Sequence, residues 1–285
     1  MSSPRHHPGK ARRSLGRGAR RLAEHLRDTE RHLEEALAGA KRTRQFVQQM
    51  FAMEPELAMK FYHFIGSYLL MKFGSDEQKE RLLPKMATGE IRAAFSLSEP
   101  ELGSDVQAIK TSAKKGEDGK YEINGQKMWV TNGLRSALVF TLVKTDPNAE
   151  KRHKGMTCFI CEKEPGVSEN TGEYAGFNVP PQLKKMGYKG VESTELVFDG
   201  YKCPAENILG GEEAGLNKGF AQMMDALEVG RANVAARGVG IAQRALELAL
   251  RYSQERKTFG KQIAKHQAIQ FKLADMATKN EAARL

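Results

Sequence analysis

Residue types suited to ligand binding gather in one stretch, Phe95–Asp105, which reads FSLSEPELGSD. Apolar and hydroxyl residues alternate at its start, and this period of two predicts a half-buried strand. Pro100 lacks an N–H donor and ends regular pairing, while Gly103 permits backbone shapes closed to other residues. Hydroxyls and free N–H groups in such a turn suit a polar, phosphate-bearing or ring-shaped ligand. Taken alone, the pattern is more often that of an ordinary polar turn.

Two later stretches add to this signal: Lys127–Gly133 (KMWVTNG) and Glu255–Gln267 (ERKTFGKQIAKHQ). Arginine suits a pyrophosphate through its planar fork, and glutamine suits an amide-like ring edge. Glu228 and Arg231 lie three apart on a helical pattern and therefore share one face. They form either a salt bridge or a contact to the amide or phosphate of a ligand.

Other chemistries find no support. Cys158 and Cys161 have a metal or redox spacing, but no second pair follows, and strand residues three apart point to opposite faces. We therefore expect structural cysteines. The seven histidines show no metal-ligand spacing, so no metal is predicted, and no G-x-S-x-G element indicates a serine hydrolase.

The basic charge of the chain is concentrated at one end. Of the 285 residues, 45 are Lys or Arg and 35 are Asp or Glu; residues 1–50 hold 12 of the former and 5 of the latter. Residues 1–45 read as a disordered or loosely helical tail, with a nucleic-acid arm, an Arg-rich transit segment or an artefactual start as alternatives. The remainder is nearly neutral, which makes nucleic-acid binding an unfavoured function.

Helical and strand periods divide the remaining chain. Residues 46–73 predict a helix ending at Gly74, and Ser75 with Gln78 forms a capping box for a helix to about residue 87, closed by Gly89. From 91 to about 205 the pattern predicts strands, with a hairpin turn at Asn124-Gly125. Residues 137–143, 156–161 and 196–198 read as buried strands of a small β-barrel or sandwich.

After residue 215 the helical period returns. One long helix, or two joined at Gly230, is expected to bury Val234, Ile241, Leu248 and Tyr252 on one face. A further helix runs from about His266 to the end of the sequence. The absence of an apolar run of about 18 residues argues against a membrane span. Three scattered cysteines favour a reducing compartment, which we take as cytoplasmic, with the mitochondrial matrix as the alternative.

In order and sequence, the three stretches resemble the acyl-CoA dehydrogenase family over about residues 55–285. The resemblance implies an α+β fold with an α-helical N-terminal part (46–91), a β-barrel middle domain (92–208) and an α-helical C-terminal bundle (209–285), the last expected to be truncated. It implies FAD as cofactor, an acyl-CoA substrate, an electron-transfer flavoprotein as electron acceptor, and a homo-dimer or homo-tetramer. The reaction would be α,β-dehydrogenation of the acyl thioester in fatty-acid or branched-chain catabolism.

The resemblance also assigns residues. The cofactor-binding residues that it implies are Phe95, Leu97, Ser98, Gly103, Ser104, Trp129, Thr131, Arg256, Phe259 and Gln267. The substrate-binding residues that it implies are Ser104, Glu228 and Arg231. Arg256, Phe259 and Gln267 match a loop that reaches the FAD of a neighbouring subunit in this family.

One departure from the family pattern concerns the catalytic base. Most members carry the base as a Glu in a later helix, so here it would lie beyond Leu285. Some members place it immediately before the residue matching Arg231, and that position is Gly230. The alternative function is therefore a non-catalytic flavin-binding fragment or oligomer partner that lacks the base.

Overall fold

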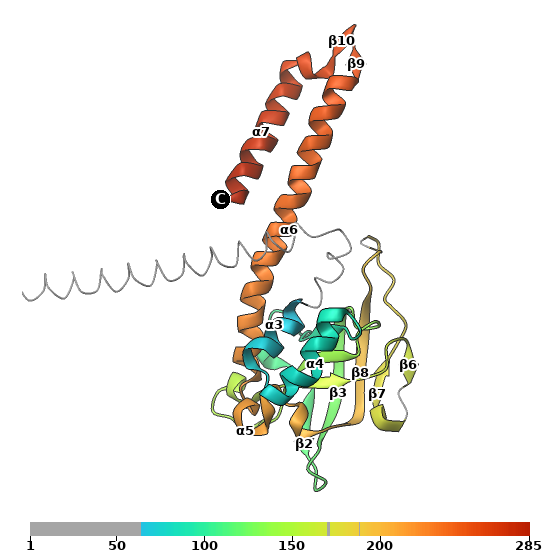
Figure 1. Ribbon diagram of the computed structural model, residues 1–285, viewed down its shortest axis with the longest axis vertical. Helices are drawn as coiled ribbons and strands as arrows, with labels where there is room; N and C mark the ends of the chain where they lie inside the picture. Colours follow the sequence, from blue (N-terminus) through green and yellow to red (C-terminus); the bar gives the residue numbers. More distant parts are fainter. Residues whose placement is uncertain (1–63, 170–171, 188) are drawn as a thin grey trace, which may run out of the picture. The chain divides into compact units, whose positions relative to one another are not determined.

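The computed structural model describes residues 64–169, 172–187 and 189–285 (Figure 1). The predicted tail, residues 1–45, and most of the predicted helical stretch 46–73 lie outside the described residues. Helix α3 (Phe64–Phe73) covers the end of that stretch, and Gly74 follows it as predicted. No helix in the described part of the chain is long and apolar enough to cross a membrane.

The predicted capping box opens helix α4 (Asp76–Thr88). The Ser75 hydroxyl accepts from the Gln78 N–H at 3.2 Å, and the Gln78 side chain accepts from the Ser75 N–H at 3.1 Å. Gly89 closes the helix with a left-handed φ of 76°, where a side chain would be strained. The Gln78 amide also donates to the carbonyl of Ile208 at 2.7 Å, which fixes α4 to the chain leaving the sheet.

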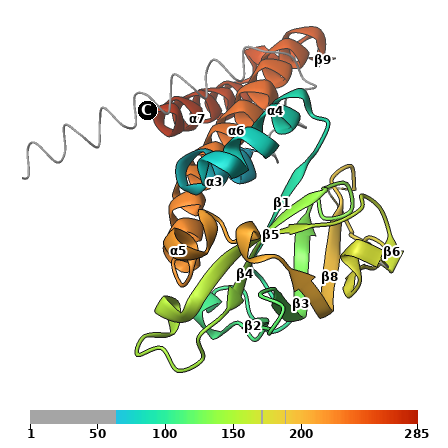
Figure 2. The ribbon, with the colours of Figure 1, turned by 60° about the horizontal axis from the view of Figure 1, so that its bottom comes forward.

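Within the described residues, eight strands form one mixed sheet, which curls round in Figure 2. The strands are β1 (Ala93–Ser96), β2 (Ser112–Lys115), β3 (Tyr121–Thr131), β4 (Leu138–Lys144), β5 (Met156–Glu162), β6 (Ser168–Glu169), β7 (Phe177–Val179) and β8 (Ser193–Cys203). Their order is β1-β4-β2-β3-β8-β7-β6, with β5 paired to β4. Strand β4 runs parallel to β1 and β2, and the other pairs are antiparallel. The three buried strands predicted from the sequence are confirmed as β4, β5 and part of β8.

The hairpin predicted at Asn124-Gly125 is wrong, because both residues lie inside the continuous strand β3. The hairpin joins β2 to β3 instead, with Lys115 paired to Tyr121 at its closed end. Gly125 has a φ of 142°, and a Cβ there would lie 2.6 Å from Thr111 Cα. Glycine is therefore needed for a close crossing of two segments and not for a turn.

Two apolar clusters lie against the sheet, and the cysteines divide between them. Cys158 packs in one cluster with Leu69 of α3 and Met223 of the following helical part. Cys161 and Cys203 belong to the other, within the sheet. The predicted opposite orientation of Cys158 and Cys161 is thus confirmed. Burial raises the pKa of the Cys158 thiol, which is consistent with a structural role.

The helical part after the sheet consists of α5 (Gly211–Gly215), α6 (Gly219–Glu255) and α7 (Gln267–Arg284). A small hairpin of β9 (Lys257–Thr258) and β10 (Lys261–Gln262) joins α6 to α7. Helix α6 is continuous through Gly230 and, at 37 residues, extends about 55 Å. Short 3₁₀ turns lie at Val106–Ala108, Arg152–Gly155, Gly172–Tyr174, Ala205–Asn207 and Ile263–Lys265.

The buried face predicted along the second half of α6 is wrong for this chain. Val234, Ile241 and Tyr252 are 58%, 64% and 58% exposed, and Leu248 is 41% exposed. The helical period identified an apolar face correctly, but the described residues do not cover it. In contrast, the first half of α6 packs closely on the sheet, since a Cβ at Gly219 would lie 2.1 Å from the Cys158 nitrogen.

Candidate functional site

The first two motif segments lie side by side. Segment one (residues 95–105) leaves β1 and enters a turn, and segment two (residues 127–133) ends β3 and enters a loop. They are joined where the Met128 N–H donates to the Ser98 carbonyl at 2.9 Å. Two stretches separated by about 30 residues in sequence therefore form one surface.

Segment one differs from its predicted alternation. Ser96 is fully buried, whereas Phe95 is only partly buried. Leu97 is buried and Ser98 is partly exposed. The next turn is closed by paired backbone hydrogen bonds between Glu99 and Leu102, at 2.7 and 3.1 Å, and it leaves Gly103 and Ser104 exposed.

A buried ion pair, missed by the sequence analysis, ties the two segments together. The side chains of Lys127 and Glu99 are 0% and 5% exposed, and Lys127 Nζ lies 3.0 Å from Glu99 Oε1. Burial lowers the pKa of Lys127 to about 8, while Glu99 opposes that shift. For Glu99, burial raises the pKa, but Lys127 and the backbone N–H donors outweigh it and the net shift is downward. Both groups are charged at neutral pH.

Trp129 stands at a bulge in β3. Between Lys127, paired with Leu196, and Val130, paired with Thr194, the register shifts so that two residues of β3 face one of β8. Trp129 has a φ of 63° and is 61% exposed, an unusual combination for a bulky residue. Backbone strain of this kind concentrates at functional sites.

The loop after Thr131 is held by side-chain contacts to backbone carbonyls. Asn132, with a φ of 65°, donates from Nδ2 to the Ala93 carbonyl at 2.9 Å. The largely buried Lys163 donates from Nζ to the carbonyls of Leu134 and Glu164, at 3.2 and 3.0 Å. Burial lowers the pKa of Lys163 to about 8. Lys163 is a second supporting residue that the motifs did not indicate.

The third group of predicted residues is remote from these segments within the chain. Arg256 follows the C-terminal end of α6, whereas the N-terminal end of α6 packs on the sheet, so most of the helix length separates them. Phe259 forms the tip of the β9–β10 hairpin with a φ of 49° and is 96% exposed. Gln267 begins α7 and is also exposed. A single chain does not bring this group to segments one and two.

Glu228 and Arg231 are both exposed on α6. The predicted alternative of a salt bridge is wrong, since these two described residues form no ion pair with each other. Gly230 is buried between them, and a Cβ there would lie 3.3 Å from the Ile65 side chain. Both charged groups are therefore available to a ligand.

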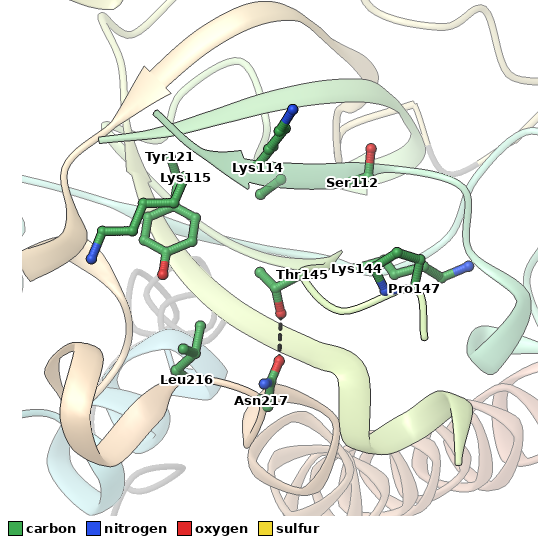
Figure 3. Close-up of a pocket in the computed structure, with 10 residues that line it drawn as sticks. Ser112, Lys114, Lys115, Tyr121, Lys144, Thr145, Pro147, Leu216 and Asn217 are labelled. Carbon is green, nitrogen blue, oxygen red and sulfur yellow. Dashed lines mark hydrogen bonds between the residues drawn. The ribbon is translucent and has the colours of Figure 1, made fainter. Parts of the chain in front are cut away.

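A separate pocket of about 540 Å³ opens along β2, at the start of β3 and the end of β4 (Figure 3). Its wall includes Tyr121, Leu216 and Asn217, and the Thr145 hydroxyl lies 2.7 Å from Asn217 Oδ1. None of the residues predicted to bind cofactor or substrate lines it. We therefore locate the candidate site at the two joined segments and not at this pocket.

Glu99 and Lys127 were missed although each lies inside a recognised motif. The sequence signal that could have indicated an ion pair was the presence of two opposite charges in stretches predicted to be half-buried strands. What the sequence does not show is that the two strands pass close enough for the side chains to meet.

Comparison with known proteins gives matches to one family over most of the sequence. Models of the acyl-CoA dehydrogenase N-terminal, middle and C-terminal domains match residues 42–90, 94–201 and 217–285. An acyl-CoA dehydrogenase of Bacillus subtilis is 42% identical over 220 residues, which are 77% of this chain and 54% of that protein. The chain thus spans about half the length of the relatives it matches.

Solved structures give the same result. Butyryl-CoA dehydrogenase from Megasphaera elsdenii has a TM-score of 0.72 and 37% identity, covering 80% of this chain and 56% of that one. An acyl-CoA dehydrogenase from Bacillus anthracis complexed with FAD has a TM-score of 0.66 and 36% identity, covering 75% and 34%. The ordered match of three domain models, together with these likenesses, shows that the chain belongs to the acyl-CoA dehydrogenase family.

Proposed function

We propose that this chain forms the flavin- and thioester-binding part of an FAD-dependent acyl-CoA dehydrogenase. The observation that carries the proposal is the junction of segments one and two, at the hydrogen bond between Met128 and Ser98. The hydroxyls of Ser98 and Thr131 have no hydrogen-bond partner among the described residues. They flank Trp129, whose exposed indole offers a large flat contact for a ring system.

These features fit a flavin. Unpaired donors beside an exposed aromatic ring match a planar group that has polar edges and apolar faces. Bound FAD would supply a hydride acceptor for dehydrogenation. In this proposal Phe95, Leu97 and Gly103 shape the same wall, Ser98 and Thr131 hydrogen-bond the ring edge, and Ser104 contacts a phosphate or the CoA portion. Glu228 and Arg231, exposed on α6, contact the acyl-CoA.

The exposed Phe259 hairpin supports an oligomer in this proposal. Arg256, Phe259 and Gln267 are separated from segments one and two by most of α6 and would instead serve the FAD of a neighbouring subunit. We also propose an electron-transfer flavoprotein as the electron acceptor.

Gly230 favours a second candidate function. It carries no carboxylate at the position where some relatives resembling this chain place their base, and its surroundings are already filled by Ile65. Removal of an α-proton without a positioned base loses about 10²–10⁴-fold in rate. The second candidate is therefore a flavin-binding chain that does not catalyse dehydrogenation unaided.

Titration with FAD and then with acyl-CoAs separates the two candidates. The purified chain is expected to quench FAD fluorescence, and Trp129→Ala should weaken that binding, whereas Phe271→Ala, at another exposed aromatic residue on α7, should leave it unchanged. Anaerobic addition of acyl-CoAs should then bleach the visible flavin band if the chain is catalytic. Flavin binding without bleaching would favour the second candidate, and absence of flavin binding would contradict both.

A further inference from the structure

We propose that Lys127 and Glu99 are positioning residues for the cofactor: their buried ion pair sets the direction in which the Ser98 N–H points at the flavin. This inference rests on the proposed function and deepens it, since it assigns the residues that hold the ring-binding backbone in place. Neither residue contacts the outer surface where a ligand would bind.

The ion pair is a junction of three backbone stretches. Lys127 Nζ donates to Glu99 Oε1 at 3.0 Å and to the Leu97 carbonyl at 3.1 Å. The Glu99 carboxylate also accepts from the N–H of Thr111 at 3.0 Å and from the N–H of Lys110 at 2.7 Å. Both charges are therefore paired and hydrogen-bonded, as buried charges must be to persist.

The hydrogen bond from Lys127 to the Leu97 carbonyl determines the direction of the Ser98 N–H. In a trans peptide the C=O and N–H point in opposite directions, and the described chain contains no cis peptide. Because the Leu97 carbonyl points inward to Lys127, the Ser98 N–H of the same peptide points away from the ion pair. That N–H has no acceptor among the described residues, while the Ser98 carbonyl is occupied by Met128. A free donor is thus directed outward beside Trp129.

The buried positions 99 and 127 hold an ion pair where two apolar residues could also pack. A buried ion pair is often no more stabilising than well-packed hydrophobic residues of similar volume. An apolar residue at position 127 could fill the space, but it could not bind the Leu97 carbonyl. With an apolar residue at position 127, nothing would fix the orientation of the peptide between Leu97 and Ser98.

Four variants test this inference: Glu99→Gln, Lys127→Met, the double variant, and the control double variant Glu101→Gln/Lys110→Met. The control removes an exposed ion pair in the same region, 2.6 Å between its charged atoms and 73% and 75% exposed. Each single variant leaves an unpaired buried charge and should lower the thermal midpoint by about 10 °C. The double variant of the buried pair should regain most of that loss.

Cofactor binding distinguishes positioning from mere stability. The double variant of the buried pair should bind FAD at least about 10-fold more weakly than wild type, with an altered visible circular dichroism of bound flavin. The exposed control should match wild type in both. A double variant that regains stability and also binds FAD with wild-type affinity and spectrum would overturn the inference and leave the proposed function intact. Wild-type protein that binds no FAD would overturn both.

A measurement on the wild-type protein avoids dependence on the folding of any variant. Hydrogen exchange at the Ser98 amide should be fast without FAD and at least about 10-fold slower with FAD bound, because the outward N–H gains an acceptor. The Met128 amide, already bonded to the Ser98 carbonyl, serves as the internal reference and should change less. A Ser98 amide whose exchange is unaffected by bound FAD would refute the assigned direction.

Discussion

The Tyr68 hydroxyl donates a hydrogen bond to Asp225 Oδ2 at 2.6 Å and thereby joins α3 to α6. Lys72, one turn further along α3, lies 2.6 Å from Asp225 Oδ1. Burial and the neighbouring Asp225 raise the pKa of Tyr68, so its hydroxyl remains a donor at neutral pH. Helix α3 is thus held to α6 by polar contacts as well as by the apolar cluster.

Tyr68→Phe removes the hydroxyl and keeps the ring. We expect the free energy of unfolding to fall by about 1–2 kcal/mol, because a hydrogen bond to a charged acceptor is lost while Lys72 still pairs with Asp225. Urea unfolding followed by circular dichroism measures this. Tyr252→Phe is the matched control, since Tyr252 is exposed on distal α6, and a loss of equal size there would show that the Asp225 contact is not the cause.

Trp129 is held in a backbone conformation that favours glycine. Trp129→Gly and Trp129→Ala both remove the indole. Only the Ala variant keeps a Cβ, which is strained at a backbone φ of 63°. We expect the Gly variant to be more stable than the Ala variant by about 1 kcal/mol, and both to bind FAD more weakly than wild type. Equal stability of the two variants would show that residue 129 relaxes out of the left-handed region.

Gly125→Ala should destabilise the fold by about 2 kcal/mol or more, because the added Cβ would collide with the backbone of Thr111. Gly103→Ala is the control, since a Cβ at Gly103 meets no atom within 4 Å. Its unfolding free energy should lie within about 0.5 kcal/mol of wild type. Thermal unfolding of both variants gives the comparison, and similar losses in the two would contradict the crossing of Gly125 and Thr111.

Sequence patterns predicted correctly those features of the fold that are formed by residues close together in the sequence. The Ser75–Gln78 capping box and the Gly89 cap are formed by neighbours in sequence, and both were predicted correctly. Asn124-Gly125 carries an equally strong local turn signal, yet the pair lies within β3. There Gly125 pairs with Phe198 of β8 and passes too close to Thr111 for a side chain. Where a distant segment imposes the constraint, local propensity is overruled.

The candidate site also has features that the sequence predicted and features that depend on contacts between distant segments. The family resemblance implied that Ser98, Trp129 and Thr131 contribute to one cofactor site, and the hydrogen bond between Met128 and Ser98 joins the two segments that carry them. The Glu99–Lys127 pair was not predicted, because it depends on the path of the chain between residues 99 and 127. The residues of the β9–β10 hairpin stay apart from this site within a single chain, because most of the length of α6 lies between them.

The Lys127–Glu99 pair should give stability a specific dependence on pH. Burial lowers the pKa of Lys127 to about 8 in the folded chain, while the unfolded lysine titrates near 10.5. Between these values the unfolded chain binds more protons, so the contribution of this group to the unfolding free energy rises with pH. Glu99, whose pKa is lowered, stays ionised in both states throughout this range and adds no slope.

We therefore expect wild type to gain stability relative to the Glu99→Gln/Lys127→Met double variant between about pH 8 and about pH 10, by an amount on the order of 2 kcal/mol. Urea unfolding of both proteins at each pH measures the difference. Lys163 also has a pKa lowered to about 8, but it is present in both proteins, so its effect cancels. A difference that falls as pH rises would mean that attraction to Glu99 outweighs burial and raises the pKa of Lys127.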